Sequence, residues 1–190
     1  GVGWVSALPW NQAPPACREM PLDQLTALSG DHPGVQAAHS TQVVHGRERA
    51  CVLKYSASFL SEQVHSLSTS LATTTQALRR LSVELARPDC RLTESQIRTK
   101  ITRRLAAAQF LDLVIRYTLV HTAGRWRLQF DVDTAAFHRL LTERLGRTVL
   151  MTNRLDWSAE QVVAAYGGQQ HVEQVFRGLK DGDWLGWGPM

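Results

Sequence analysis

The chain has few cysteines, few lysines and no long apolar run. Its three cysteines, Cys17, Cys51 and Cys90, are widely spaced, which excludes a disulfide framework and a cysteine-rich zinc site and predicts reduced thiols. No apolar stretch approaches the roughly 20 residues that cross a bilayer, and the first residues lack the basic and then apolar layout of a signal peptide. We therefore expect no association with a membrane and a cytoplasmic location.

The signatures of several enzyme classes are also absent. The sequence has no G-x-x-x-x-G-K-[ST] phosphate loop, no G-x-S-x-G nucleophile elbow and no pair of histidines at metal-binding spacing on one helix face. What remains is a composition typical of globular proteins, with 190 residues of which 44% are hydrophobic and 20% charged. Because the chain begins directly in a strand-like sequence and ends without a helix cap, we expect it to be part of a longer protein.

Arginine is abundant and unevenly distributed. The net charge is +4, and arginine outnumbers lysine by eighteen to three. Residues 79–104 contain eight basic and three acidic residues, so the rest of the chain carries a net charge of −1. Clustered arginine suits bidentate contacts with phosphate. Genomic base composition and an ordinary solvated surface are alternative explanations that the sequence leaves open.

Strand signals in the first third of the chain surround a long irregular segment. Residues 1–8 predict a buried strand that ends at Pro9, and residues 49–56 predict a second strand. Between them, residues 11–46 are rich in proline, glycine and serine. This composition predicts an irregular connector with one short helix near residues 22–28.

The strongest periodic signal predicts a helical hairpin over residues 57–108. Apolar residues at alternating steps of four and three form a heptad seam on a helix of about 30 residues. The seam consists of Leu60, Val64, Leu67, Leu71, Thr74, Leu78, Leu81 and Leu85. Pro88 ends this helix, and a capping box at Thr93 and Gln96 begins a second one. Its apolar stripe of Ile97, Ile101, Leu105 and Ala108 matches the seam, so we expect the two helices to pair antiparallel.

The remaining elements follow from alternation and capping signals. Residues 111–120 and 125–132 predict a β-hairpin. Asp133 then caps a predicted helix that ends at Gly146, and residues 148–152 predict a short strand. A capping box that begins at Ser158 starts a final helix to Lys180, which the two glycines at 167 and 168 could interrupt.

The final helix carries the most informative polar set. At about 100° per residue, Tyr166, Gln169, Glu173 and Lys180 project from one side, beside an apolar stripe. A carboxylate between a hydroxyl, an amide and a lysine suits one metal-ligating acid flanked by groups that hold a phosphate. The alternative interpretation is the exposed polar face of an amphipathic helix.

The run from Tyr166 to Lys180 resembles the Y-x2-R-x3-E-x6-K signature of bacterial insertion-sequence DDE transposases of the insertion sequence four superfamily. Tyr166, Glu173 and Lys180 are identical to the signature at its spacing. Residues 149–153 resemble the strand that enters the signature helix in that family. Residues 1–8 resemble the strand that follows the second catalytic aspartate.

The resemblance implies an α/β fold, a fragment of a ribonuclease H-like core interrupted by an α+β insertion containing a long helical hairpin. It implies a core strand in residues 1–10, a connector and insertion in residues 11–153, and the glutamate-bearing helix with a C-terminal tail in residues 154–190. In that family three acidic residues hold two divalent ions, Mg²⁺ or Mn²⁺, for cleavage and strand transfer of DNA. Glu173 would be the third acid.

The implied partners are DNA, both transposon ends and target, and a second copy of the protein in a nucleoid-associated homodimer. Tyr166 and Lys180 would contact the DNA backbone near the cleaved end. Gln169 stands where the signature has arginine, which removes a charge from the phosphate clamp, and Arg177 on the same side could replace it. The two aspartates are expected upstream of residue 1, so we expect the chain alone to be inactive. Asp131 and Asp133 are interpreted as a strand end and a helix cap.

Two further features are candidates for DNA contact. Arg98, Arg103 and Arg104 on the predicted helical hairpin would form an auxiliary surface for the DNA backbone. Trp126, between Arg125 and Arg127, could stack on an extruded base or pack across the β-hairpin. The alternative functions are a non-catalytic helical interaction or DNA-binding module, in which the heptad seam pairs with a partner, and an inactive transposase remnant.

Overall fold

The computed structural model describes residues 3–29 and 32–180, and the side chains of residues 3–29 and 32–169. The chain forms two compact units. The first, termed the sheet unit, comprises residues 1–57 and 147–190, and the second, termed the helical unit, comprises residues 58–146. The expected boundaries at residues 10 and 153 do not coincide with those of the units, because residues on both sides of the helical unit contribute strands to one sheet.

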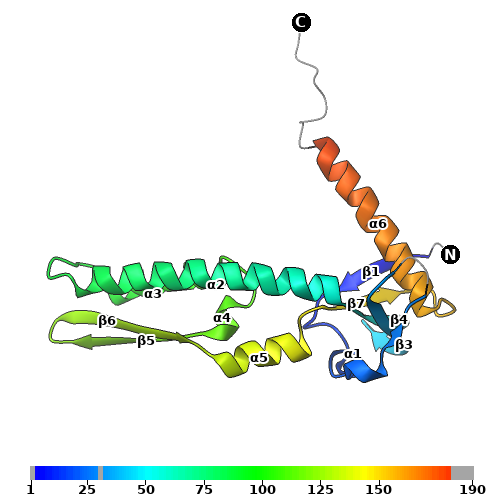
Figure 1. The fold of residues 1–190 in the computed structure, drawn as a ribbon, viewed down its shortest axis with the longest axis horizontal. Coiled ribbons are helices and arrows are strands. Elements are labelled where there is room, and N and C mark those ends of the chain that lie inside the picture. Colours follow the sequence, from blue (N-terminus) through cyan, green and yellow to red (C-terminus); the bar gives the residue numbers. More distant parts are fainter. Residues whose placement is uncertain (1–2, 30–31, 181–190) are drawn as a thin grey trace, which may run out of the picture. The chain divides into compact units, whose positions relative to one another are not determined.

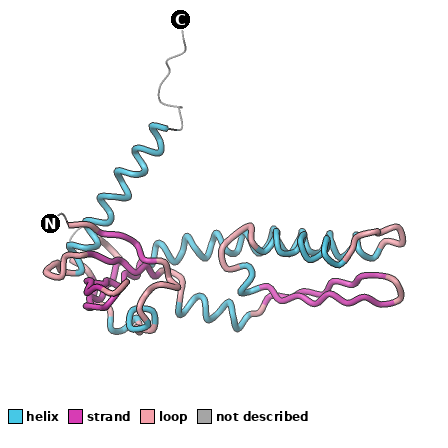
Figure 2. The backbone as a smooth tube through the Cα atoms, turned by 180° about the vertical axis from the view of Figure 1, so that it is seen from behind, coloured by secondary structure: helices cyan, strands magenta, loops and turns pink. Residues whose placement is uncertain are grey.

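The sheet unit is built on five antiparallel strands in the order β1-β7-β4-β3-β2. The strands are β1 (Val5–Leu8), β2 (Thr26–Ala27), β3 (Val35–Val44), β4 (Arg47–Ser56) and β7 (Arg147–Thr152). A short helix α1 (Pro15–Arg18) and a 3₁₀ turn η1 (Leu22–Gln24) lie between β1 and β2. Figure 2 shows these strands gathered together, with β1 and β7 drawn from distant parts of the chain. The predicted strands over residues 49–56 and 148–152 are confirmed as β4 and β7. The strand predicted over residues 1–8 is confirmed as β1 for residues 5–8, and residues 1 and 2 lie outside the described residues.

The expected irregular connector over residues 11–46 is corrected by β3, a strand of ten residues. Pro33 and Gly34 precede it and suggested a loop, and its sequence lacks large β-branched residues except at its ends. It is a strand because it pairs with β4 along its whole length, from Val35 opposite Ser56 to Val44 opposite Arg47. The predicted helix near residues 22–28 is only the three-residue η1.

Both faces of the sheet are covered by apolar clusters. Successive side chains of a strand point to opposite faces, so neighbouring residues of β4 enter different clusters. Cys51 and Leu53 of β4 are buried in one apolar cluster with parts of α1 and the loop around it. Val52, between them, is buried in a second cluster on the other face. There, Val162 and Val163 of α6 (Ala159–Lys180) are buried against the sheet. The start of α6 is therefore fixed on the sheet by apolar packing.

The helical unit contains the predicted helical hairpin and β-hairpin (Figure 1). Helix α2 (Ala57–Ala86) and helix α3 (Glu94–Leu105) confirm the heptad and capping-box predictions. Strands β5 (Ile115–Thr122) and β6 (Arg125–Val132) pair antiparallel, and α5 (Thr134–Glu143) follows them. Residues 111–114, predicted as strand, form instead the single-turn helix α4 (Leu111–Val114). The one-turn helix allows both end residues to be fully buried.

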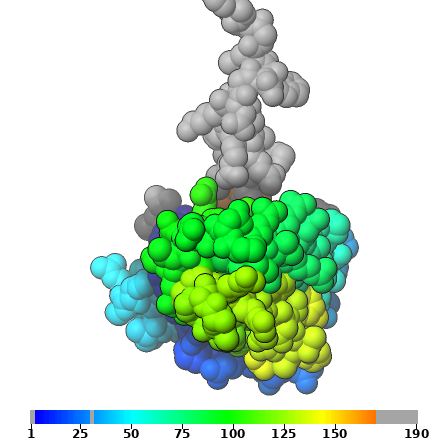
Figure 3. Space-filling view, turned by 90° about the vertical axis from the view of Figure 1, so that its left-hand side faces the viewer, coloured from blue at the N-terminus to red at the C-terminus, as the bar shows by residue number. Residues whose placement is uncertain are grey.

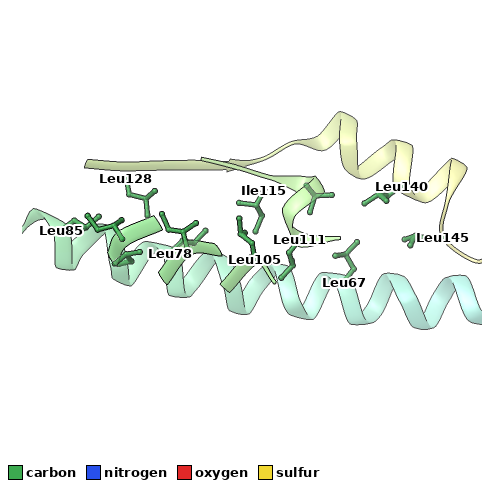
Figure 4. Packing of buried hydrophobic residues seen from close by; sticks show 13 residues of the cluster. Leu67, Leu78, Leu85, Leu105, Leu111, Ile115, Leu128, Leu140 and Leu145 are labelled. Carbon is green, nitrogen blue, oxygen red and sulfur yellow. The ribbon is translucent and has the colours of Figure 1, made fainter. Parts of the chain in front are cut away.

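The heptad seam of α2 forms one side of the core of the helical unit. Figure 4 shows Leu67, Leu78 and Leu85 pointing toward the side of the unit where α4, β5, β6 and α5 lie. Ile97 and Ile101 of α3 are fully buried in the same cluster. The seam is therefore occupied by residues of this chain. No helix among the described residues is both long and apolar enough to cross a membrane.

Candidate catalytic helix and nucleic-acid interface

The connection from β7 to α6 is held by a polar contact to Trp4, the residue before β1, and by contacts within itself. The backbone N–H of Trp4 donates to the Asn153 side-chain oxygen at 3.1 Å. The Arg154 guanidinium donates to both carboxylate oxygens of Asp156, at 3.0 and 2.8 Å, and lies over the ring of Trp157 at 5.5 Å. The Arg154 contact lowers the pKa of Asp156. These contacts fix where the chain enters α6 relative to β1.

A capping box starts α6 where the sequence predicts it. The backbone N–H of Gln161 donates to the Ser158 hydroxyl at 3.2 Å, and the Ser158 N–H donates to the Gln161 side chain at 2.9 Å. Ser29 adds a hydrogen bond to the Glu160 carboxylate at 2.9 Å. The helix continues through Gly167 and Gly168 without interruption, so the residues before and after the glycines share one helical register.

Two of the polar residues predicted on α6 lie among the described side chains. Tyr166 is half-buried and packs against the apolar cluster under α6, and Gln169 is exposed. Glu173, Arg177 and Lys180 belong to α6, and their side chains lie outside the described residues. The structure therefore gives these residues a common helix and leaves their mutual distances undefined.

The described side chains provide no metal site. Among residues 3–29 and 32–169, no three His, Cys, Asp or Glu side chains lie close enough together to hold a metal ion. Asp133 acts as the predicted helix cap, since its carboxylate accepts the N–H of Ala136 at 2.8 Å and pairs with Arg116 at 3.3 Å. The Ala136 N–H, followed by Arg116, lowers the pKa of Asp133.

Trp126 lies in the β-hairpin, directly opposite His121. The two rings have centroids 4.5 Å apart at an angle of 42°. Trp126 is half-buried and packs against the core of the helical unit. The side chain therefore makes the cross-strand contact that the packing interpretation of the sequence predicts.

The three candidate arginines of α3 have different environments. Arg98 donates to Glu94 at 2.7 Å, one turn earlier on α3, and this contact raises its pKa. Arg103 and Arg104 instead line a groove between α2 and α3. Arg80 and Lys100, two basic residues outside the predicted DNA-contact set, line the same groove. Their spacing was the available signal, because Lys100 and Arg104 lie one turn apart on the helix face that carries them.

The sheet unit also contains a buried pair of thiols. The Cys17 sulfur lies 3.6 Å from the Ser40 hydroxyl, and Cys17 and Cys51 are both completely buried. A hydrogen bond from Cys51 lowers the pKa of Cys17 to about 7 against the opposing effect of burial, and the same bond raises the pKa of Cys51. Because neither sulfur is accessible, the pair is part of the core, and all three cysteines are free.

Comparison of the chain with known protein families, with curated proteins and with solved structures gives no match.

Proposed function

We propose that the chain is part of a DDE transposase in which Glu173 is one of three acidic metal ligands. The proposal is carried by one structural observation, namely that the helix bearing Glu173 is anchored on the sheet beside β1. Val162 and Val163 of α6 share an apolar cluster with Val5 of β1, and Trp4 bonds the connection before α6. The resemblance places the second aspartate on a strand that precedes β1 in sequence, so the anchored start of α6 would hold the helix of Glu173 at a fixed position relative to the strand that follows that aspartate.

The order of the two units along the chain supports an interrupted core in the sheet unit. The five strands of its sheet are antiparallel, the start of α6 packs on one face, and the helical unit is inserted in sequence between β4 and β7. An insertion that precedes the glutamate-bearing helix is what the resemblance implies. The insertion as proposed here comprises residues 58–146, and the adjoining segments belong to the core.

In the proposed site, Glu173 would supply one carboxylate oxygen ligand to Mg²⁺ or Mn²⁺, ions that prefer oxygen donors. Bound divalent ions activate the attacking oxygen and stabilise the leaving oxygen in phosphodiester cleavage. A single carboxylate does not make a metal site, so the other two ligands would come from sequence before residue 1. Tyr166, Gln169 and Lys180 would contact the DNA backbone, with Arg177 in place of the missing arginine. The complete protein would act as a homodimer on the nucleoid.

Strand nicking by the complete protein that contains this chain tests the role of Glu173. With Mg²⁺ and DNA carrying the element's ends, we expect Glu173→Gln to abolish nicking while end binding is retained. Glu160→Gln is the matched control, because Glu160 lies on the same helix and bonds only Ser29 among the described side chains. Nicking by the Glu173→Gln protein at the rate of the control would remove Glu173 from the mechanism.

The partner-helix alternative depends on a free heptad seam on α2. Leu67, Leu78, Leu81 and Leu85 of that seam are buried within the helical unit, and Leu60, Val64 and Leu71 are partly buried against the same cluster. Most of the seam is therefore occupied by residues of this chain. If the alternative is nevertheless correct, Leu71→Asp with Leu78→Asp would dissolve a concentration-dependent oligomer, which sedimentation would reveal.

A further inference from the structure

We propose that the groove between α2 and α3 binds the phosphate backbone of duplex DNA without reading its sequence. This groove, termed the α2–α3 groove, is lined by Arg80 and Glu84 of α2 and by Lys100, Arg103 and Arg104 of α3. The identification of the ligand as DNA rests on the proposed function. The groove itself is defined by contacts within the helical unit alone.

The charges in the α2–α3 groove are unbalanced. Its only carboxylate, Glu84, already pairs with Lys100 at 3.1 Å. In the described part of the chain, Arg80, Arg103 and Arg104 are exposed and have no ion-pair partner. Three unpaired guanidinium groups around one groove attract an anion, and guanidinium binds phosphate oxygens through two parallel hydrogen bonds.

The basic surface extends along α2 beyond the groove. A neighbouring hollow is lined by Arg79, Arg80 and Arg87 together with Glu84. The next, at the end of the hairpin, is lined by Arg87 and Arg91 together with Glu84 and Asp89. Arg80 lies about 9 Å from the end of α2 at Ala86, at about 1.5 Å per residue, and Arg87 directly follows that end. One strand of duplex DNA advances about 3.4 Å along the duplex axis per phosphate. The row therefore covers about three phosphate steps of a duplex that lies along it.

The shape of this surface favours a backbone over a single small anion or an acidic peptide. Cations line both walls of the α2–α3 groove. Beyond it, Arg79, Arg87 and Arg91 outnumber the two carboxylates, Glu84 and Asp89, so positive charge continues in the direction that a chain of phosphates would take. Figure 3 shows the end of the helical unit, where the helical hairpin (green) lies on one side and β5 and β6 (yellow-green) lie on the other. Four exposed side chains of the groove are cations, namely Arg80, Lys100, Arg103 and Arg104. Cations bind the phosphates of any sequence, and we therefore expect binding independent of sequence.

Arg98 provides the internal comparison. It lies on the same helix as Lys100, Arg103 and Arg104 and is paired with Glu94. It lies outside the α2–α3 groove and lines a neighbouring hollow, to which Arg103 also contributes. Arg139 on α5 is also exposed and lies outside the α2–α3 groove. Removing Arg98 and Arg139 therefore changes the net charge as much as removing Arg80 and Arg104, while the groove stays intact.

The test uses the 190-residue chain and a labelled 16-base-pair duplex of random sequence, with affinity measured between 50 and 200 mM KCl. Each phosphate contact contributes about 0.9 to the slope of log affinity against log salt. For Arg80→Ala with Arg104→Ala we expect a slope smaller by about 2 and affinity lower by at least about tenfold at 50 mM. For Arg98→Ala with Arg139→Ala we expect the slope of the parent chain.

Equal slopes for the two double variants would overturn the proposal, because attraction would then depend only on net charge. Absence of duplex binding by the parent chain, or equally tight binding of poly-glutamate, would also overturn it. Failure of the transposase proposal is seen in a different measurement, namely nicking by the Glu173→Gln protein. That substitution lies outside the α2–α3 groove, so it should leave the duplex affinity and its salt slope unchanged. Circular dichroism of each variant checks that the exposed substitutions leave helix content intact.

Discussion

The sheet unit and the helical unit are assembled in opposite ways. The sheet unit joins residues from both ends of the chain, since β1 and β4 both pair with β7. The helical unit is one continuous stretch whose hairpins connect neighbours in sequence. It carries thirteen basic and eight acidic residues, whereas the rest of the chain carries eight and nine. The excess of positive charge therefore lies in the inserted helical unit, whereas the helix with Glu173 belongs to the interrupted sheet unit.

Removing the helical unit tests whether the sheet unit folds without it and whether DNA binding is lost with it. Tyr55 and Arg147 are register partners in β4 and β7, so their Cα atoms lie about 5 Å apart, and Ala57 follows Tyr55 by two residues. We expect a chain that lacks residues 58–146, with Ala57 joined to Arg147 through Asn-Gly, to keep a cooperatively folded sheet. It should also lose binding to duplex DNA. Thermal melting followed by circular dichroism measures the first result, and the titration described for the α2–α3 groove measures the second.

The control for this deletion is the same shortened chain with Leu150→Asp. Leu150 is completely buried in β7, and a charge there has no partner in the apolar cluster around it. The control should show no cooperative transition. If the shortened chain melts like this control, the sheet unit depends on the helical unit, and the division into interrupted and inserted parts fails.

One core substitution in each unit tests whether the two units open independently. Ile101 in the helical unit and Leu150 in the sheet unit are both completely buried. We expect Ile101→Ala and Leu150→Ala each to lower the opening free energy of its own unit by about 2–5 kcal/mol, the usual cost of such a cavity. Hydrogen exchange followed by mass spectrometry resolves the two units in one experiment.

The controls for these substitutions are exposed valines in the same units. Val83 on α2 is 63% exposed and Val43 on β3 is 71% exposed, so changing either to alanine should have little effect. Loss of protection in both units after one core substitution would show that they open together, contrary to the comparison.

The same contrast explains which parts of the fold the sequence predicts. Elements of the helical unit are predicted by local signals, such as the heptad seam and the Asp133 cap. Another is the capping box, in which Thr93 and Gln96 exchange hydrogen bonds at 2.9 and 3.4 Å. Local signals do not predict β3, because this strand is stabilised by its pairing with β4, which the pattern of its own residues does not reveal. α4 was missed because Phe110 adopts a left-handed backbone conformation, with φ 69°, immediately before it.

The candidate site divides along similar lines. The start of α6 at its capping box and the placement of Tyr166 and Gln169 on that helix follow from local sequence. Arg80 and Lys100 were not recognised, because they come together only when α2 and α3 pack antiparallel. Closeness in sequence groups Arg98 with Arg103 and Arg104, whereas the helix places its side chain beside Glu94, four residues earlier.

A smaller effect concerns the Asp133 cap and its dependence on pH. The pKa of Asp133 lies below its ordinary value of 3.8 in the folded protein, so its contribution to stability is present above that pH and is lost as pH falls below it. Asp133→Asn keeps an oxygen that can cap the helix but does not titrate. We expect the parent to be more stable than the variant at pH 6 and this difference to shrink at pH 3. Hydrogen exchange in α5 measures it, and a difference that is constant with pH would contradict the prediction.

The smallest expected effect compares one turn in each unit. His45 and Gly46 connect β3 to β4, and Ala123 and Gly124 connect β5 to β6, with positive φ at all four residues. A left-handed backbone costs alanine about 1 kcal/mol, whereas asparagine and histidine adopt it more readily. Asn-Gly is the preferred sequence for such two-residue turns. Ala123→Asn should therefore stabilise the β5–β6 hairpin by up to about 1 kcal/mol, and His45→Asn should stabilise β3–β4 by less. Hydrogen exchange in each hairpin measures both changes, and a larger gain at His45 would mean that side-chain contacts, rather than backbone conformation, determine the stability of these turns.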